Sequence, residues 1–165
     1  MKIRSRGNRT RSEPDRATAP RLFPDDAAIV RIGEGLLAHT WPRADWTHEA
    51  HLAATTWLLR NRPDIEVDRD VATIISTYNE SVGGVNDDMG GYHDTITRAF
   101  VAGIRAHLAR RDGSEPIAAC VNALLESPAG QRDWPMRFYS RELLFSVAAR
   151  RGFVPPDLAP FPVPC

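Results

Sequence analysis

Apolar side chains recur along this chain with the spacing of α-helices. Val71, Ile74, Ile75, Tyr78 and Val82 follow an i, i+3, i+4, i+7, i+11 pattern, which places them on one helical face. Similar patterns predict helices over residues 25–38, 47–61, 67–82 and 92–111, a fifth starting at Ser114, and a sixth from Ser140 to near Gly152. No stretch alternates apolar and polar residues for long enough to predict a strand, so the sequence indicates an all-α fold.

The connections between the first four predicted helices are short. Short connections favour antiparallel neighbours, so we expect an up-down bundle of four core helices. The two C-terminal helices would then pack outside this bundle or across one end. We expect a single helical domain over residues 23–165 that ends in an extended proline-rich tail from Pro155 onward.

The N-terminal segment differs in charge from the rest of the chain. The 165 residues have a formal net charge of zero, so no global field favours nucleic acid or a membrane. Residues 1–22, however, carry seven basic against two acidic residues and few apolar ones. We interpret them as a disordered basic tail. An arm for nucleic acid or an acidic partner is the alternative, but the sequence lacks the interleaved aromatics and helix-turn-helix pattern that would support it.

Several whole-chain features narrow the class of protein. No apolar run approaches the roughly 18 residues of a membrane span, and no apolar segment typical of a secretory signal follows the N-terminus. Cys120 and Cys165 do not form a disulfide framework. Lys2 is the only lysine beside twenty arginines, which indicates GC-rich bacterial DNA. We expect a cytoplasmic protein whose partner is a small-molecule ligand, and a homodimer is compatible with the sequence.

Three histidines are expected to meet at one end of the bundle. His48 and His51 are three residues apart at the start of the second predicted helix, on the face that continues through Leu52 and Thr55. His93 opens the fourth predicted helix and precedes Ile96 at helical spacing. If the second and fourth helices run parallel, their N-termini share one end of the bundle, and the three imidazoles converge there.

Three imidazoles suit a catalytic metal site with an open position. Zinc commonly takes three protein ligands and a water molecule, and iron, manganese or nickel can use a similar set. The sequence therefore gives His48, His51 and His93 as candidate metal ligands. The competing interpretation is that these histidines cap helices and satisfy buried hydrogen bonds. A metalloprotease motif is excluded, because His48 and His51 are one residue too close for His-Glu-x-x-His.

Other polar residues are expected near these histidines. Asp94 and Glu49 are candidates for orienting a histidine or moving a proton. Candidate substrate contacts come from the third helix, the glycine-rich segment 83–91 and its end, and the C-terminal region: Tyr78, Asn86, Tyr92, Arg137 and Arg141. The two arginines are four residues apart and could clamp a carboxylate, or they could be an ordinary surface pair. The glycine-rich segment is interpreted as a lid or a flexible connection.

Several segments resemble those of a known group of proteins. Trp46 to Leu52, Gly83 to Asn86, Gly91 to Thr97 and Tyr139 to Ser146 are similar to segments of a family of small uncharacterised bacterial helical proteins. The likeness covers about residues 25–160 and excludes the basic tail. It implies a complete protein of that kind and carries over no catalytic role.

The leading functional hypothesis is a small helical metalloenzyme that acts on a small polar or anionic metabolite. A metal-bound water would serve as nucleophile or base, and hydrolase, lyase or oxygenase chemistry would depend on the metal. The alternative hypothesis is a non-catalytic protein that binds an anionic small molecule in the same histidine-lined site. A third is an interaction module that docks through the basic tail.

Overall fold

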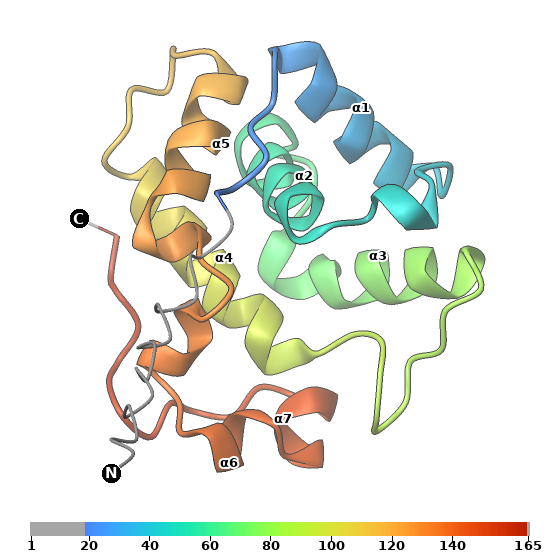
Figure 1. The fold of residues 1–165 in the computed structure, drawn as a ribbon, viewed down its shortest axis with the longest axis vertical. Helices are drawn as coiled ribbons and strands as arrows, with labels where there is room; N and C mark the ends of the chain where they lie inside the picture. The colour runs from blue at the N-terminus through green and yellow to red at the C-terminus, as the bar shows by residue number, and fades with distance from the viewer. Residues whose placement is uncertain (1–18, 165) are drawn as a thin grey trace, which may run out of the picture.

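The structure is a computed structural model that describes residues 19–164, and within this range it is all-helical. Seven α-helices and three short 3₁₀ turns follow one another along the chain (Figure 1). Their bounds are α1 Asp26–Leu37, η1 Arg43–Asp45, α2 His48–Asn61, α3 Val67–Ser81, α4 Asp94–Leu108, α5 Ile117–Glu126, η2 Pro128–Gly130, η3 Trp134–Arg137, α6 Arg141–Leu144 and α7 Val147–Arg151. The predicted all-α class is confirmed. The basic tail predicted for 1–22 falls mainly on residues outside the described range.

Helix α2 occupies the centre of the fold. Every residue from Leu52 to Leu58 is buried, which covers all sides of the helix rather than one face. A helix that is apolar all round must be surrounded by other elements, and α1, α3, α4 and α5 all pack against α2. Figure 1 views α2 nearly end-on while α3 runs across the picture. The predicted up-down order of four antiparallel helices is therefore not confirmed.

The main hydrophobic core lies between α2 and the helices around it. Its largest fully buried side chains include Ile29 and Leu36 of α1, Leu52 and Leu58 of α2, and Ile104 of α4. Asp25 caps α1, because its carboxylate accepts the backbone N–H of Ala28 at 2.8 Å. This core fixes the N-terminal turns of α2 and α4 relative to each other, which positions the candidate site.

A second, smaller core joins the C-terminal segment to α4. Ala99 of α4 packs with Trp134, Phe138, Tyr139 and Leu144. The Trp134 indole N–H donates to the backbone oxygen of Ala99 at 2.9 Å, so the polar atom of this buried ring is satisfied. In Figure 1, α6 and α7 accordingly lie beneath the first turns of α4.

The proline-rich C-terminal segment contributes to the second core. Phe161 packs against Phe138, with ring centroids 5.2 Å apart. The Tyr139 hydroxyl donates to the backbone oxygen of Val154 at 2.8 Å, and the Leu158 N–H donates to that of Phe138 at 2.9 Å. No helix among the described residues is long and apolar enough to cross a membrane.

Three predicted helix boundaries are corrected by capping interactions. Helix α4 starts at Asp94 rather than Tyr92, since His93 is its N-cap. Helix α5 starts at Ile117, because the Ser114 N–H and hydroxyl both bond the Asp112 carboxylate in a turn instead of capping a helix. The predicted sixth helix is two short helices, and the Ser146 hydroxyl caps the second by accepting the Ala149 N–H. Gly152 ends that second helix, close to the predicted position.

Candidate functional site

A cavity of about 530 Å³ opens between the first turns of α2 and α4. This volume is in the range of small-molecule sites. Helix α3, the end of the glycine-rich segment and the C-terminal region complete its wall. The lining residues are Trp46, His48, His51, Leu52, Thr55, Ile75, Asn79, Gly91, Tyr92, His93, Ile96, Thr97, Phe100, Arg132 and Arg150.

Helix α2 presents two imidazoles to this cavity from its first turn. Thr47 is the N-cap, and its hydroxyl oxygen accepts the Ala50 N–H at 3.2 Å. The His51 ring packs on the Trp46 indole, with centroids 3.8 Å apart. His48 and Phe100 meet edge to face, with centroids 5.3 Å apart. Aromatic neighbours from other segments thus hold both rings at the cavity wall.

Backbone oxygens fix which nitrogen of each ring carries the proton. The His48 Nε2 lies 2.7 Å from the backbone oxygen of Gly130, and the His51 Nδ1 lies 2.8 Å from that of Thr47. A carbonyl oxygen only accepts, so these two nitrogens donate. Burial lowers the pKa of His48, and burial lowers the pKa of His51 to about 4. Both rings are therefore neutral near pH 7.

His93 has a structural role at the start of α4. Its Nδ1 accepts the Ile96 N–H at 3.3 Å, which makes its side chain the N-cap, and its Nε2 donates to the backbone oxygen of Leu144 at 2.9 Å. The ring is buried, and burial lowers its pKa. His93 thus caps α4 and joins its first turn to α6. These are the two tasks, capping a helix and satisfying a buried hydrogen bond, that were the alternative to metal binding.

The predicted metal site is not supported by this arrangement. His48, His51 and His93 do line one cavity. However, no group of three or more His, Cys, Asp or Glu residues within 19–164 could hold a metal ion. The physical reason lies in His93, because both of its nitrogens are engaged in hydrogen bonds with the chain. Two imidazoles remain, which is fewer than the three protein ligands of a typical catalytic zinc site.

Substitutions at His93 should show how much each of its two hydrogen bonds contributes to the stability of the protein. His93→Asn keeps a capping acceptor but loses the bond to Leu144, whereas His93→Ala loses both. We expect the free energy of unfolding to fall by about 1 kcal/mol in the first variant and by about 2 kcal/mol in the second. Urea unfolding followed by circular dichroism measures both values. Equal losses in the two variants would show that the cap contributes nothing.

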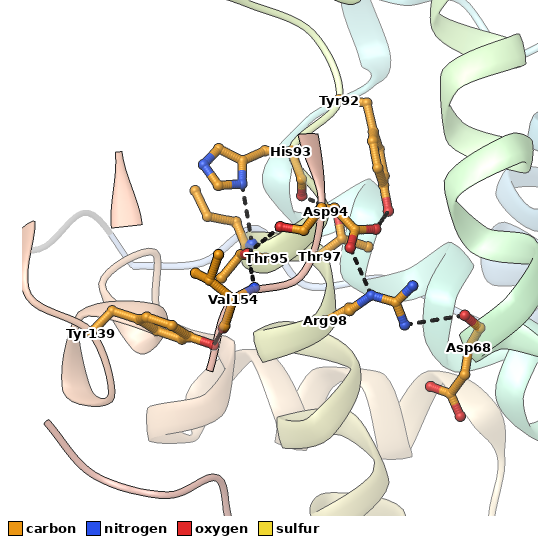
Figure 2. A network of polar contacts seen from close by, with 11 residues as sticks. Asp68, Tyr92, His93, Asp94, Thr95, Thr97, Arg98, Tyr139 and Val154 are labelled. Atoms are coloured by element: carbon orange, nitrogen blue, oxygen red, sulfur yellow. Dashed lines mark hydrogen bonds and ion pairs between the residues drawn. The ribbon is translucent and has the colours of Figure 1, made fainter. Parts of the chain in front are cut away.

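Asp94 and Tyr92 form a polar network beside the cavity (Figure 2). The Tyr92 hydroxyl donates to Asp94 Oδ1 at 2.8 Å, and Arg98 Nε donates to Asp94 Oδ2 at 2.8 Å. Arg98 also donates to the backbone oxygen of Asp68 at 3.1 Å. Asp94 is buried and is not among the residues that line the cavity, and both of its carboxylate oxygens are bonded to the protein. Tyr92 lines the cavity, and the bond to Asp94 orients its ring.

Glu49, the other predicted catalytic carboxylate, also stays outside the cavity lining. Its nearest basic partner is Arg132, at the outer limit of an ion pair with a separation of 4.0 Å. Burial raises its pKa, but its own backbone N–H, the Thr47 hydroxyl and Arg132 outweigh burial, and the net pKa is lowered. Glu49 therefore contacts the cavity wall through Arg132.

Two of the predicted substrate contacts are engaged with the protein itself. Tyr78 is fully buried, and its hydroxyl donates to the backbone oxygen of Trp41 at 2.9 Å. Asn86 joins the glycine-rich segment to α3 and to Tyr92, which precedes α4. Its side-chain oxygen accepts from Asn79 and from the Tyr92 N–H, both at 2.9 Å, and its nitrogen donates to Ser76 and Glu80. Neither residue lines the cavity.

The glycine-rich segment 83–91 forms an anchored turn structure beside the cavity. Gly91 has φ +77°, and a Cβ there would lie 2.3 Å from the backbone oxygen of Val85, so glycine is required. Asp88 forms a two-point ion pair with Arg151 of α7, at 2.6 and 2.7 Å. A second hollow of about 520 Å³ lies on this side and shares Tyr92 and Arg150 with the first. Of this segment, only Gly91 lines the first cavity.

The arginines of the cavity are not the predicted pair. Arg137 stacks over Trp134 and Arg141 over Phe145, with the guanidinium carbon 5.8 and 5.2 Å from the ring centroids, and neither lines the cavity. Arg132 and Arg150 line it instead. No local signal identifies them, because Arg132 lies between two 3₁₀ turns and Arg150 lies in a five-residue helix. Their place depends on how the C-terminal segment docks on α4.

The comparisons with known proteins do not identify the chain. No protein-family model, no curated protein and no solved structure matches it significantly.

Proposed function

We propose that this protein binds a small anionic molecule in the cavity between α2 and α4. The observation that carries the proposal is the charge of the wall, which includes Arg132 and Arg150 but no aspartate or glutamate. A wall whose charged groups all have one sign attracts ligands of the opposite sign. The first turns of two long helices also face this space, and their N-terminal ends carry partial positive charge.

Both arginines have donors left for a ligand. Arg150 donates through one terminal nitrogen to the backbone oxygens of Gly91 and Tyr92, at 3.2 and 3.3 Å, and none of its contacts within 19–164 is an ion pair. Arg132 is 73% exposed, and its distance of 4.0 Å to Glu49 makes that pair a weak one. Guanidinium groups recognise carboxylate and phosphate through paired N–H donors.

Binding is favoured over metal-dependent catalysis because of the engaged His93 ring. A metalloenzyme would need a third ligand from elsewhere on the chain. Anion binding needs only groups that already line the cavity and have unused donors. The neutral rings of His48 and His51 add polar atoms to the wall without adding a competing charge.

Calorimetric titration with 3-phenylpropionate and with inorganic phosphate tests the proposal. We expect Arg132→Gln to weaken binding of the probe for which the parent protein has the higher affinity. The loss should be about tenfold, since one charge-assisted hydrogen-bonded contact is removed. Arg150→Gln should weaken it similarly, and higher salt should weaken binding to the parent. Arg110→Gln changes the net charge equally at an exposed site outside this cavity and serves as the matched control. Equal affinities in all four proteins, or binding to none, would refute the proposal.

A further inference from the structure

Two imidazole nitrogens at the cavity wall remain free to accept hydrogen bonds. Because His48 Nε2 and His51 Nδ1 donate to backbone oxygens, the lone pairs of the neutral rings lie on His48 Nδ1 and His51 Nε2. Neither of these atoms has a hydrogen bond within residues 19–164. No fully buried side-chain nitrogen or oxygen of the described residues lacks a partner, so both nitrogens must be accessible.

The hydroxyl groups of the wall add acceptors rather than donors. Thr55 Oγ1 donates to the backbone oxygen of His51 at 2.8 Å, and Thr97 Oγ1 donates to that of His93 at 2.9 Å. Tyr92 donates to Asp94. With each hydroxyl proton directed at the protein, only oxygen lone pairs are left for a ligand. The wall therefore combines charged donors on the arginines with an excess of neutral acceptors.

Apolar and aromatic side chains also line this cavity. Trp46, Leu52, Ile75, Ile96 and Phe100 line the cavity beside the polar groups. A ligand that is only a small ion would leave these surfaces in contact with water. An apolar or aromatic body on the ligand would bury them, at a gain of roughly 25 cal/mol for each Å² removed from water.

We propose that the ligand is an anion that also carries a hydroxyl group and an apolar body, such as an aryl-substituted or branched hydroxy acid or hydroxyalkyl phosphate. The inference rests on the proposed anion binding and names its substrate class. The arginines would hold the carboxylate or phosphate, and the hydroxyl would donate to His51 Nε2 or His48 Nδ1. An amino acid is disfavoured, because its ammonium group would lie near Arg132 and Arg150.

Matched probes that differ by one hydroxyl test the inference. We expect 3-phenyllactate to bind at pH 7.5 about tenfold more tightly than 3-phenylpropionate, because a site built to bond a hydroxyl rejects the analogue that lacks it. Phenylalanine should bind more weakly than 3-phenyllactate. The corresponding phosphate pair is 2-hydroxy-2-phenylethyl phosphate and 2-phenylethyl phosphate. Whichever hydroxy compound binds more tightly, 3-phenyllactate or 2-hydroxy-2-phenylethyl phosphate, shows whether the site prefers a carboxylate or a phosphate.

Variants at His51 assign the hydroxyl to its acceptor. In His51→Phe the ratio of the affinities for 3-phenyllactate and 3-phenylpropionate should fall toward one. His51→Gln retains an acceptor and should keep part of the preference, which also guards against a variant that fails to fold. His48→Phe is the parallel test of the second acceptor.

The outcomes separate this inference from the proposed function. Equal binding of the members of each pair would overturn the hydroxyl preference and leave anion binding in place. Failure of all the anions to bind would overturn both the hydroxyl preference and the proposed anion binding. Titrations in buffers of different ionisation enthalpy add a further check. Uptake of one proton on binding would overturn the inference, because the imidazole would then act as a charged donor instead of a neutral acceptor.

Discussion

Replacing Gly33 with alanine is expected to destabilise the protein by about 3 kcal/mol, although alanine is the better helix former by about 1 kcal/mol. Gly33 lies inside α1 and is buried against α2. A Cβ at this position would lie 2.1 Å from Cε3 and 2.5 Å from Cδ2 of Trp57. Trp57 is only 6% exposed and packed in the main core, so it has little room to move away. The close packing of α1 against α2 thus requires a residue without a side chain at position 33.

Urea unfolding of three variants measures this effect. Gly113→Ala is the matched control, because a Cβ there meets nothing within 4 Å, and its stability should change by less than about 0.5 kcal/mol. Combining Gly33→Ala with Trp57→Leu removes the ring that would clash. We expect the cost of Gly33→Ala to shrink in that background, as a double-mutant cycle would show. A Gly33→Ala protein at least as stable as the parent would refute the packing argument.

Acidification from pH 6.5 to pH 4 is expected to remove about 2 kcal/mol of stability through His51 alone. The pKa of His51 is lowered from 6.5 to about 4 in the folded protein, mainly by burial; the backbone oxygen of Thr47 opposes this shift, and the nearby charges of His48 and Arg132 add to it. Arg150 and His93, from α7 and from the start of α4, line the same cavity. Between these pH values the unfolded chain binds a proton that the folded protein does not. The stabilisation is therefore complete above pH 6.5 and is lost as the pH falls.

The variant His51→Gln isolates this contribution. Its free energy of unfolding should fall by about 2 kcal/mol less than that of the parent between pH 7 and pH 4. Burial also lowers the pKa of His48, His93 and His107, so some pH dependence should remain in the variant. Nuclear magnetic resonance titration of the His51 ring gives a direct midpoint. A midpoint near 6.5, or identical pH dependence in the two proteins, would contradict the prediction.

Local sequence pattern predicted the helices well because short-range interactions determine them. Helix α3 begins at the predicted residue and ends one residue early, and α2 ends at the predicted Asn61, because Pro63 disfavours a helical conformation at Arg62. The periodicity of His48, His51, Leu52 and Thr55 correctly put these residues on one face, and all four line the cavity. Capping was harder to predict, because His93 acts as an N-cap although histidine is not among the preferred capping residues.

The sequence by itself determined the helical class, most helix positions and the pairing of two imidazoles on the first turn of α2. Only the tertiary structure decided which charges and which ring nitrogens face the cavity. His48 bonds Gly130, 82 residues away, and His93 bonds Leu144, 51 residues away. Arg132 and Arg150 reach the wall because the second core docks the C-terminal segment on α4, whereas Arg137 and Arg141 lie over Trp134 and Phe145, aromatic rings three and four residues away. Periodicity acts within a few residues of a helical turn, while the contacts of His48, His93, Arg132 and Arg150 depend on packing between distant segments, and no local pattern records them.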